Sequence, residues 1–78
     1  MSAYTIVLET DEGGGYVVSV PALPGCFTQG ETREEAIENA REAISLYVDE
    51  LRSRGEPVPV EVKTETEVLD LPELDTGT

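Results

Sequence analysis

Residues 32–55 read TREEAIENAREAISLYVDELRSRG, and this stretch decides the fold. Its apolar residues recur mostly at three- and four-residue steps, which places them on one face of a helix. They are Ala36, Ile37, Ala40, Ile44, Val48 and Leu51. Thr32 and Glu35 form a T-x-x-E capping box, in which each side chain satisfies the backbone N–H of the other residue. The pattern predicts a helix from about Arg33 to Arg54, ended by Gly55.

Three segments before the helix have the composition of β-strands. Residues 4–9 alternate in side-chain direction, which is the period of a strand. Residues 11–15, DEGGG, supply a turn, and residues 16–20 resume a β-branched run, so the two runs predict an antiparallel hairpin. A Pro-rich stretch then interrupts the ladder, and residues 26–29 are predicted to form a third short strand.

The region after the helix divides into two parts. Residues 58–62 alternate valine with other residues, and the neighbouring prolines restrict such a segment to the edge of a sheet. From residue 64 onward the chain is acidic and contains no base, which favours disorder or an extended arm. Its few apolar side chains, Val68, Leu69, Leu71 and Leu74, are candidates for docking on a partner or a sister subunit. We therefore expect a domain over residues 1–63 and an acidic tail over residues 64–78.

The element order predicts an α+β fold, with a three- to four-stranded antiparallel sheet and one long helix packed on one face. A single helix covers only one face of such a sheet. Val7 and Val17 are expected on the other face, where they leave an apolar patch that needs a partner. We therefore expect a homo-oligomer, either a dimer or a tetramer.

The charge balance restricts the possible ligands. The 78 residues include 17 acids and 5 bases, for a net charge of −12. Direct binding of nucleic acid needs a clustered basic surface, which this chain cannot build. A basic protein is the better electrostatic match, although strong acidity also simply keeps a small protein soluble.

Several kinds of chemistry are absent from the sequence. There is no histidine, so Ser–His, Cys–His and His–metal sites are excluded, and we expect no cofactor and no metal. Gly13–Gly15 precede a predicted strand, whereas the glycines of a phosphate-binding loop precede a helix. We therefore expect a turn at these glycines. Cys26 has no base beside it to activate the thiol, and is expected to be a buried apolar side chain. No signal peptide or membrane-spanning stretch is evident, so the cytoplasm is the expected compartment.

One catalytic alternative involves carboxylates. Glu9, Asp11 and Glu12 lie at the end of the first strand, and Glu31 precedes the helix. Gathered together, they would suit the Mg²⁺ ions of a two-metal nuclease. The competing interpretation is that they are solvated charges around a turn.

The combined pattern of motifs resembles the HicB antitoxin family. The matching pieces are Tyr4-Thr5-Ile6-Val7-Leu8-Glu9, Asp11-Glu12-Gly13-Gly14, Tyr16-Val17-Val18-Ser19-Val20-Pro21, Leu23-Pro24-Gly25-Cys26 and Thr28-Gln29-Gly30-Glu31-Thr32-x-x-Glu35-Ala36. They run in order from about Tyr4 to Pro59. The resemblance implies a partial, degenerate RNase H-like fold. Full-length members carry a further DNA-binding segment, where this chain has its acidic tail, so operator binding is not implied.

The resemblance also implies a function, which is binding and neutralising a small basic HicA-like toxin that cleaves mRNA. It implies no catalytic residues, so we expect a non-enzymatic binding protein. The partner-binding candidates are Glu9, Asp11, Glu12, Val7 and Val17. The alternative function is an orphan homo-oligomeric regulatory or scaffolding module without a toxin.

Overall fold

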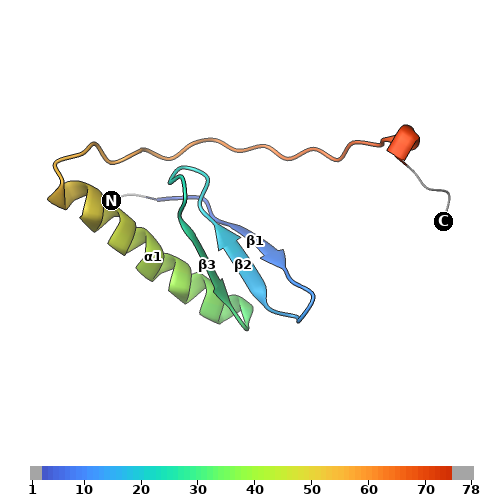
Figure 1. Ribbon diagram of the computed structural model, residues 1–78, viewed down its shortest axis with the longest axis horizontal. Helices are drawn as coiled ribbons and strands as arrows, with labels where there is room; N and C mark the ends of the chain where they lie inside the picture. Colours follow the sequence, from blue (N-terminus) through green and yellow to red (C-terminus); the bar gives the residue numbers. More distant parts are fainter. Residues whose placement is uncertain (1–2, 75–78) are drawn as a thin grey trace.

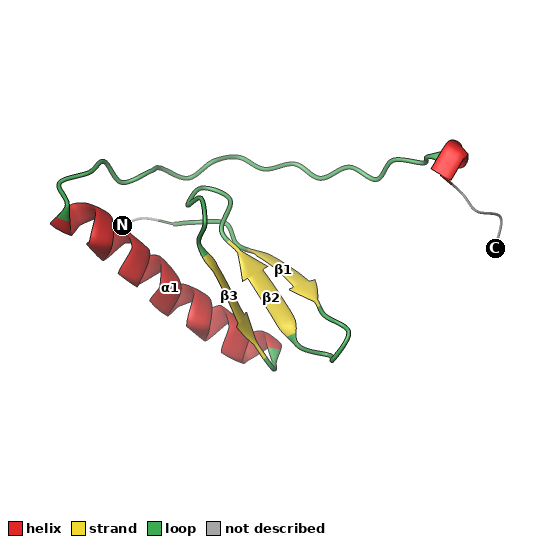
Figure 2. Cartoon of the chain, in the orientation of Figure 1, coloured by secondary structure: helices red, strands yellow, loops and turns green. Residues whose placement is uncertain are grey.

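The computed structural model describes residues 3–74, in which an antiparallel sheet is covered on one face by a single helix (Figure 1). The sheet has the order β1-β2-β3. The elements are β1 (Val7–Thr10), β2 (Tyr16–Ser19), β3 (Phe27–Gly30), α1 (Arg33–Ser53) and a short 3-10 helix, η1 (Pro72–Leu74) (Figure 2). The predicted α+β class, a sheet with one long helix on one face, is confirmed.

The first strand is shorter than the sequence predicts, because β1 begins at Val7 rather than at residue 4. Its partner β2 ends at Ser19, which pairs with Val7, so the residues before Val7 have no ladder to join. The chain after β2 instead folds into a turn, in which the N–H of Val20 donates to the carbonyl of Cys26 at 3.2 Å. The β2–β3 connection therefore limits the length of the sheet.

The hairpin turn between β1 and β2 depends on Asp11. One carboxylate oxygen of Asp11 accepts the backbone N–H groups of Gly13 at 2.8 Å and Gly15 at 2.9 Å. Of the three consecutive glycines, only Gly14 has a left-handed backbone, with φ of 88°. This is the local side-chain-to-backbone bonding that lets aspartate close a turn. The predicted hairpin is confirmed.

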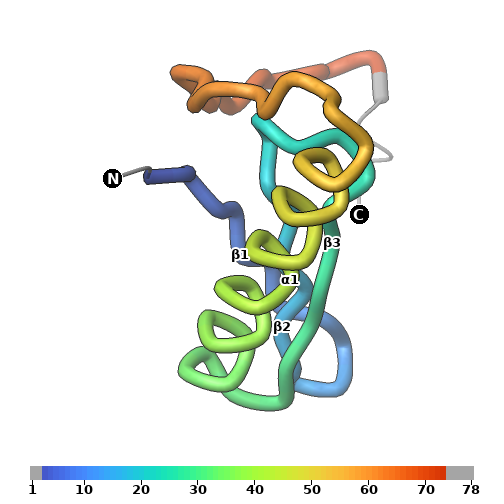
Figure 3. The backbone as a smooth tube through the Cα atoms, turned by 90° about the vertical axis from the view of Figure 1, so that its left-hand side faces the viewer, coloured from blue at the N-terminus to red at the C-terminus, as the bar shows by residue number. Residues whose placement is uncertain are grey.

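Figure 3 shows α1 running along the sheet. The core lies between the two. Val18 of β2 packs against Ala36 and Ala40 of α1, and the small alanines let the helix approach the strands closely. A second cluster is centred on Leu23, which is fully buried in the β2–β3 turn and packs with Cys26. The turn thus supplies part of the core.

Both ends of α1 have the predicted caps, with one difference. The Thr32 hydroxyl accepts the N–H of Glu35 at 3.1 Å, as expected. The Glu35 carboxylate, however, accepts the N–H of Glu31 at 2.9 Å, whereas the capping box predicts that of Thr32. At the other end Gly55 has φ of 70°. Paired bonds from Gly55 and the next residue to the last turn of the helix complete a Schellman motif.

The predicted edge strand over residues 58–62 is not present as a strand in the described chain. Pro57 and Pro59 remove two ladder donors, and the segment is extended without pairing to the sheet. It contacts the start of the chain, where the Tyr4 hydroxyl donates to the carbonyl of Pro59. Further along, the chain extends away from the sheet and the helix (Figure 1). The domain boundary at residue 63 stays a prediction, and residues 75–78 of the predicted tail lie outside the described residues.

Candidate functional site

The face of the sheet opposite α1 is the first candidate for a binding site, and we call it the open face. Strand register arranges its side chains in two rows of three. One row is Val7, Ser19 and Phe27, and the other is Glu9, Val17 and Gln29. Alternation along each strand sends these side chains away from the helix, while their neighbours, such as the fully buried Val18, face it.

The open face carries three exposed apolar side chains. Val7 is 37% exposed, Val17 is 38% exposed and Phe27 is 67% exposed. The structure therefore places Val7 and Val17 where the sequence predicts them. Phe27 was not among the predicted partner-binding residues, although the signal was present. Once Cys26 is assigned to the core, the alternation of the third strand directs Phe27 outward.

The open face and the adjoining turn are acidic. Glu9 stands beside Val17 on the open face, while Asp11 and Glu12 are exposed in the turn that follows β1. All five bases lie at Arg33 or later, so the first 32 residues contain no positive side chain. The structure thus brings Val7, Glu9 and Val17 onto one face and keeps the two turn carboxylates at its end.

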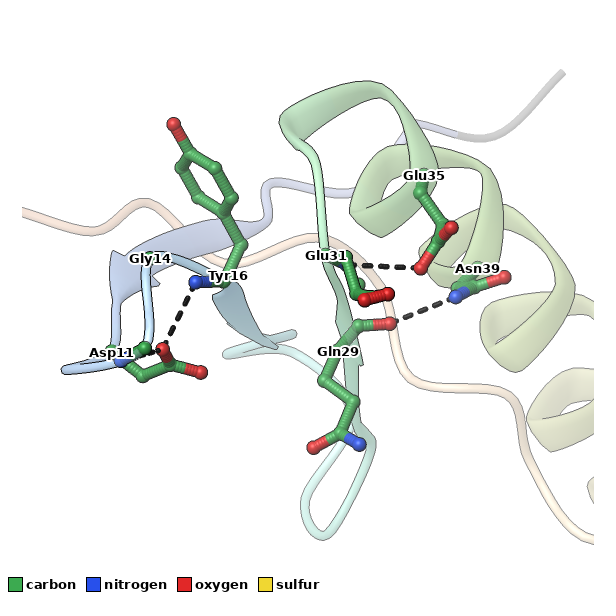
Figure 4. A pocket seen from close by; sticks show the side chains of 10 residues that line it. Asp11, Gly14, Tyr16, Gln29, Glu31, Glu35 and Asn39 are labelled. Carbon is green, nitrogen blue, oxygen red and sulfur yellow. Dashed lines mark hydrogen bonds between the residues drawn. The ribbon is translucent and has the colours of Figure 1, made fainter.

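A cavity of about 540 Å³ lies where the hairpin turn approaches the start of α1 (Figure 4). Asp11, Glu31 and Glu35 all contribute to its lining, whereas Glu9 and Glu12 do not. Asp11 is bonded to the turn glycines and Glu35 to the backbone of Glu31. These two carboxylates therefore serve the turn and the helix cap.

The metal-nuclease hypothesis requires the carboxylates of Glu9, Asp11, Glu12 and Glu31 to lie close enough together to share metal ions. In the portion of the chain that the structure describes, no group of three His, Cys, Asp or Glu residues is placed to hold a metal ion. The predicted cluster is split between the open face, the turn and the helix start. The solvated-charge interpretation agrees better with the positions of Glu9, Asp11, Glu12 and Glu31.

Cys26 is 5% exposed and belongs to the core cluster around Leu23. Burial raises the pKa of its thiol, because the thiolate would lose its hydration there. The residue is therefore a small apolar side chain in the core, as the sequence predicts.

Over residues 3–74, the structure contains no helix that is both long enough and apolar enough to cross a membrane.

Comparison with known proteins places these features in a family. Residues 4–77 match the family model described as the HicB-like antitoxin of bacterial toxin–antitoxin systems. A UPF0150 protein of Thermoplasma acidophilum is 54% identical over 56 residues, which cover 72% of this chain and 81% of that protein. The antitoxin HicB 1 of Photorhabdus laumondii is 38% identical over 69 residues, or 88% of this chain and 44% of that antitoxin.

A solved structure gives the same result for the fold. The crystal structure of the N-terminal domain of the Burkholderia pseudomallei antitoxin HicB superposes with a TM-score of 0.62 at 36% identity. The match covers 92% of this chain and 78% of that one. This chain spans less than half the length of the Photorhabdus antitoxin, so the similarity to that protein concerns only part of it.

Proposed function

This chain belongs to the HicB-like antitoxin family, and we propose that it binds and neutralises a small basic toxin of the HicA-like type. In this proposal the chain is a non-catalytic inhibitor that covers the surface with which the toxin meets RNA. The observation that carries the proposal is the open face, where exposed apolar side chains adjoin Glu9, Asp11 and Glu12 without any base among them.

Each part of the open face has a physical role in this proposal. Phe27, Val7 and Val17 supply the apolar centre, and aromatic side chains are the common anchors of protein interfaces. The carboxylates at the rim meet the positive charge that a toxin uses to bind RNA phosphates. Such charges raise the association rate by steering, and salt weakens their effect.

The first experiment is an affinity capture from the source lysate at low salt, repeated at high salt, followed by purification of the captured toxin. We expect a small basic protein that is released by salt and whose RNA cleavage this chain suppresses. Recovery of this chain alone, or of a basic protein whose cleavage is unaffected, would contradict the proposal.

The apolar contact is tested with Phe27→Ala, using Leu46→Ala as its matched control. Both side chains are largely exposed, at 67% and 63%, but Leu46 lies on α1 away from the open face. We expect Phe27→Ala to weaken toxin binding by about 2 kcal/mol or more, as loss of an interface anchor does. Equal effects of the two substitutions on affinity would place the toxin elsewhere.

The acidic rim is tested with the double variant Glu9→Gln, Glu12→Gln. Its control is Glu34→Gln, Glu42→Gln on α1, which changes the net charge by the same amount. Asp11 is left intact because it holds the turn. The first pair should slow association and flatten its salt dependence, whereas the second pair should change both much less. The same slowing in both pairs would indicate overall charge rather than a local surface.

The second candidate function is a homo-oligomeric regulatory or scaffolding module without a toxin. The observation that favours it is the extended segment after α1, whose Val60, Val68 and Leu69 are 72–89% exposed in the single chain. We propose a homo-oligomer in either case, because these side chains and the apolar side chains of the open face are exposed in the single chain, and exposed apolar patches commonly mark interaction sites.

A further inference from the structure

We infer that residues 58–68, here called the arm, pair through residues 62–68 as a β-strand along the free edge of β1 in a second copy of this chain. This inference rests on the homo-oligomer proposed above and does not depend on toxin binding. It identifies both the segment that is exchanged and the groove that receives it.

The arm has the sequence of a strand. β-Branched side chains occupy every second position, at Val58, Val60, Val62, Thr64, Thr66 and Val68. Between them stand residues that are mostly charged, including Glu61, Lys63, Glu65 and Glu67. Such a run fits a strand with one buried face and one solvated face. In the single chain every residue of the arm from Val60 onward is exposed, and Val60 itself is 79% exposed.

The domain holds the arm only at its beginning. The Tyr4 hydroxyl donates to the Pro59 carbonyl, and the Thr5 N–H donates to the Glu61 carboxylate at 2.8 Å. The arm then runs past the sheet and away from it (Figure 1). As a result the molecule measures 53 × 26 × 20 Å, and its radius of gyration is 15.9 Å. A compact domain of this length would have a radius of gyration of about 11–12 Å.

The receiving site is the edge of β1 together with a mostly apolar groove beside the segment that leads into it. β1 is an edge strand of the sheet, so one side of its backbone has no strand partner among residues 3–74. A groove of about 620 Å³ lies between the segment leading into β1 and α1. Its lining includes Tyr4, Ile6, Ile37 and Ile44. β3 is also an edge strand, but only the edge beside the N-terminal segment borders this apolar groove.

The arm and the groove match in their pattern of apolar side chains. A strand added beside β1 turns alternate side chains toward the helix, as Ile6 and Leu8 already do. The valines and threonines of the arm therefore enter the groove, and its glutamates face outward.

A second copy is the occupant that these observations select. The described residues after Glu61 are exposed, and the arm of each chain runs past its own sheet and away from it (Figure 1), whereas an arm arriving from another chain is free to align with the edge. Mutual exchange around a two-fold axis fills both grooves with two identical contacts and leaves a closed dimer. The seven residues from Val62 to Val68 span about 23 Å as a strand, which is longer than the four-residue β1.

The experiment is light scattering after size exclusion, applied to the full chain and to single proline variants. We expect the full chain to have twice its 8.4 kDa mass. Along a strand paired on one side, only alternate N–H groups reach the partner. Proline removes the backbone N–H, and the N–H groups of Thr64 and Glu65 point to opposite sides of the strand. The proline whose position faces the partner should therefore weaken the dimer at least tenfold, and the other proline should weaken it much less. A monomeric full chain, or equal effects of the two prolines, would overturn the inference.

A substitution of the apolar row provides a second readout. Val62→Asn with Val68→Asn should give a monomer, while Leu46→Asn, a change at an exposed position of α1, should not. A dimer that survives the double change would also overturn the inference. Salt separates this interaction from the proposed toxin binding. Two chains of charge −12 repel each other, so salt should strengthen the dimer, whereas it should weaken the toxin complex.

Discussion

Gly30 stands where the last residue of β3 meets the first turn of α1, and it is the residue on which their packing depends. A Cβ atom placed on Gly30 would lie 2.7 Å from the Cα of Ala36, closer than real carbon atoms approach. The neighbour is backbone, so it cannot move aside without displacing the helix. Both Gly30 and Ala36 are therefore small for the same reason, which is the short distance between strand and helix.

Gly30→Ala should destabilise the fold by about 1–3 kcal/mol or more, as overpacking of a tight contact does. Chemical denaturation followed by circular dichroism measures the free energy of unfolding. The control is Gly13→Ala, because a Cβ atom there would make only an ordinary contact of 3.4 Å with the Asp11 carboxylate. Equal losses for the two glycines would show that the β3–α1 approach is looser than described.

The reactivity of the Cys26 thiol also depends on how deeply this single residue is buried. Burial raises the pKa of the thiol, so fewer molecules carry the reactive thiolate at neutral pH. We expect disulfide reagents to modify Cys26 much more slowly in the folded protein than in denaturant. Because the pKa of the thiol is higher in the folded state, its contribution to the free energy of unfolding is fully present below pH 9.0, the ordinary pKa. This contribution is lost as the pH rises through the pKa of the folded state. Folded and denatured samples that react at one rate would disprove the burial.

At the scale of elements, the parts that the sequence predicts well are those stabilised by neighbours along the chain. The α1 helix, its Thr32 cap, its Gly55 terminus and the Asp11 turn all depend on residues within about five positions of one another. The capping-box prediction was wrong only in the donor of the second bond, since the Glu35 carboxylate accepts the N–H of Glu31 instead of that of Thr32. The choice between adjacent N–H groups depends on side-chain rotamers rather than on residue type.

The parts that the sequence predicts less well depend on distant partners. Residues 58–62 have the alternation of a strand, but alternation specifies only which face is apolar, not which edge pairs with it. The same reason applies to the start of β1, which lacks a ladder because β2 ends at Ser19. The positions of Val7 and Val17 on the open face could be predicted because one helix covers only one face of the sheet. The position of Phe27 could be assigned only once the register of β3 was known.

The attachment of the arm can be tested through Glu61. Hydrogen bonds from the side chain and backbone of Thr5 lower the pKa of the Glu61 carboxyl below its ordinary 4.5. The bonded arrangement should therefore persist above that value and be lost as pH falls through the lowered pKa. An NMR titration of the Thr5 amide should report this midpoint, and Glu61→Gln should abolish the titration. A midpoint at or above 4.5 would mean that the arm is not held there.

At the scale of the whole molecule, charge opposes compactness. The net charge is −12 over 78 residues, and the few ion pairs in the described chain involve exposed side chains of α1 and the residues just after it. Exposed pairs contribute little to stability. The first 32 residues hold acids without any base, so repulsion within the sheet and its turn is not compensated locally. An acidic chain of this kind gains stability when a cation or a basic partner approaches.

Salt should therefore raise the melting temperature of the isolated protein, because screening weakens this self-repulsion beyond a Debye length of about 8–10 Å. The measurement is thermal unfolding at low and high sodium chloride, repeated at several protein concentrations. Concentration dependence separates the monomer's own gain from tighter self-association, since only the latter shifts the midpoint with concentration. Glu34→Gln with Glu42→Gln reduces the net charge and should reduce the salt response with it. A melting temperature that falls with salt would instead indicate that favourable ion pairs outweigh the repulsion.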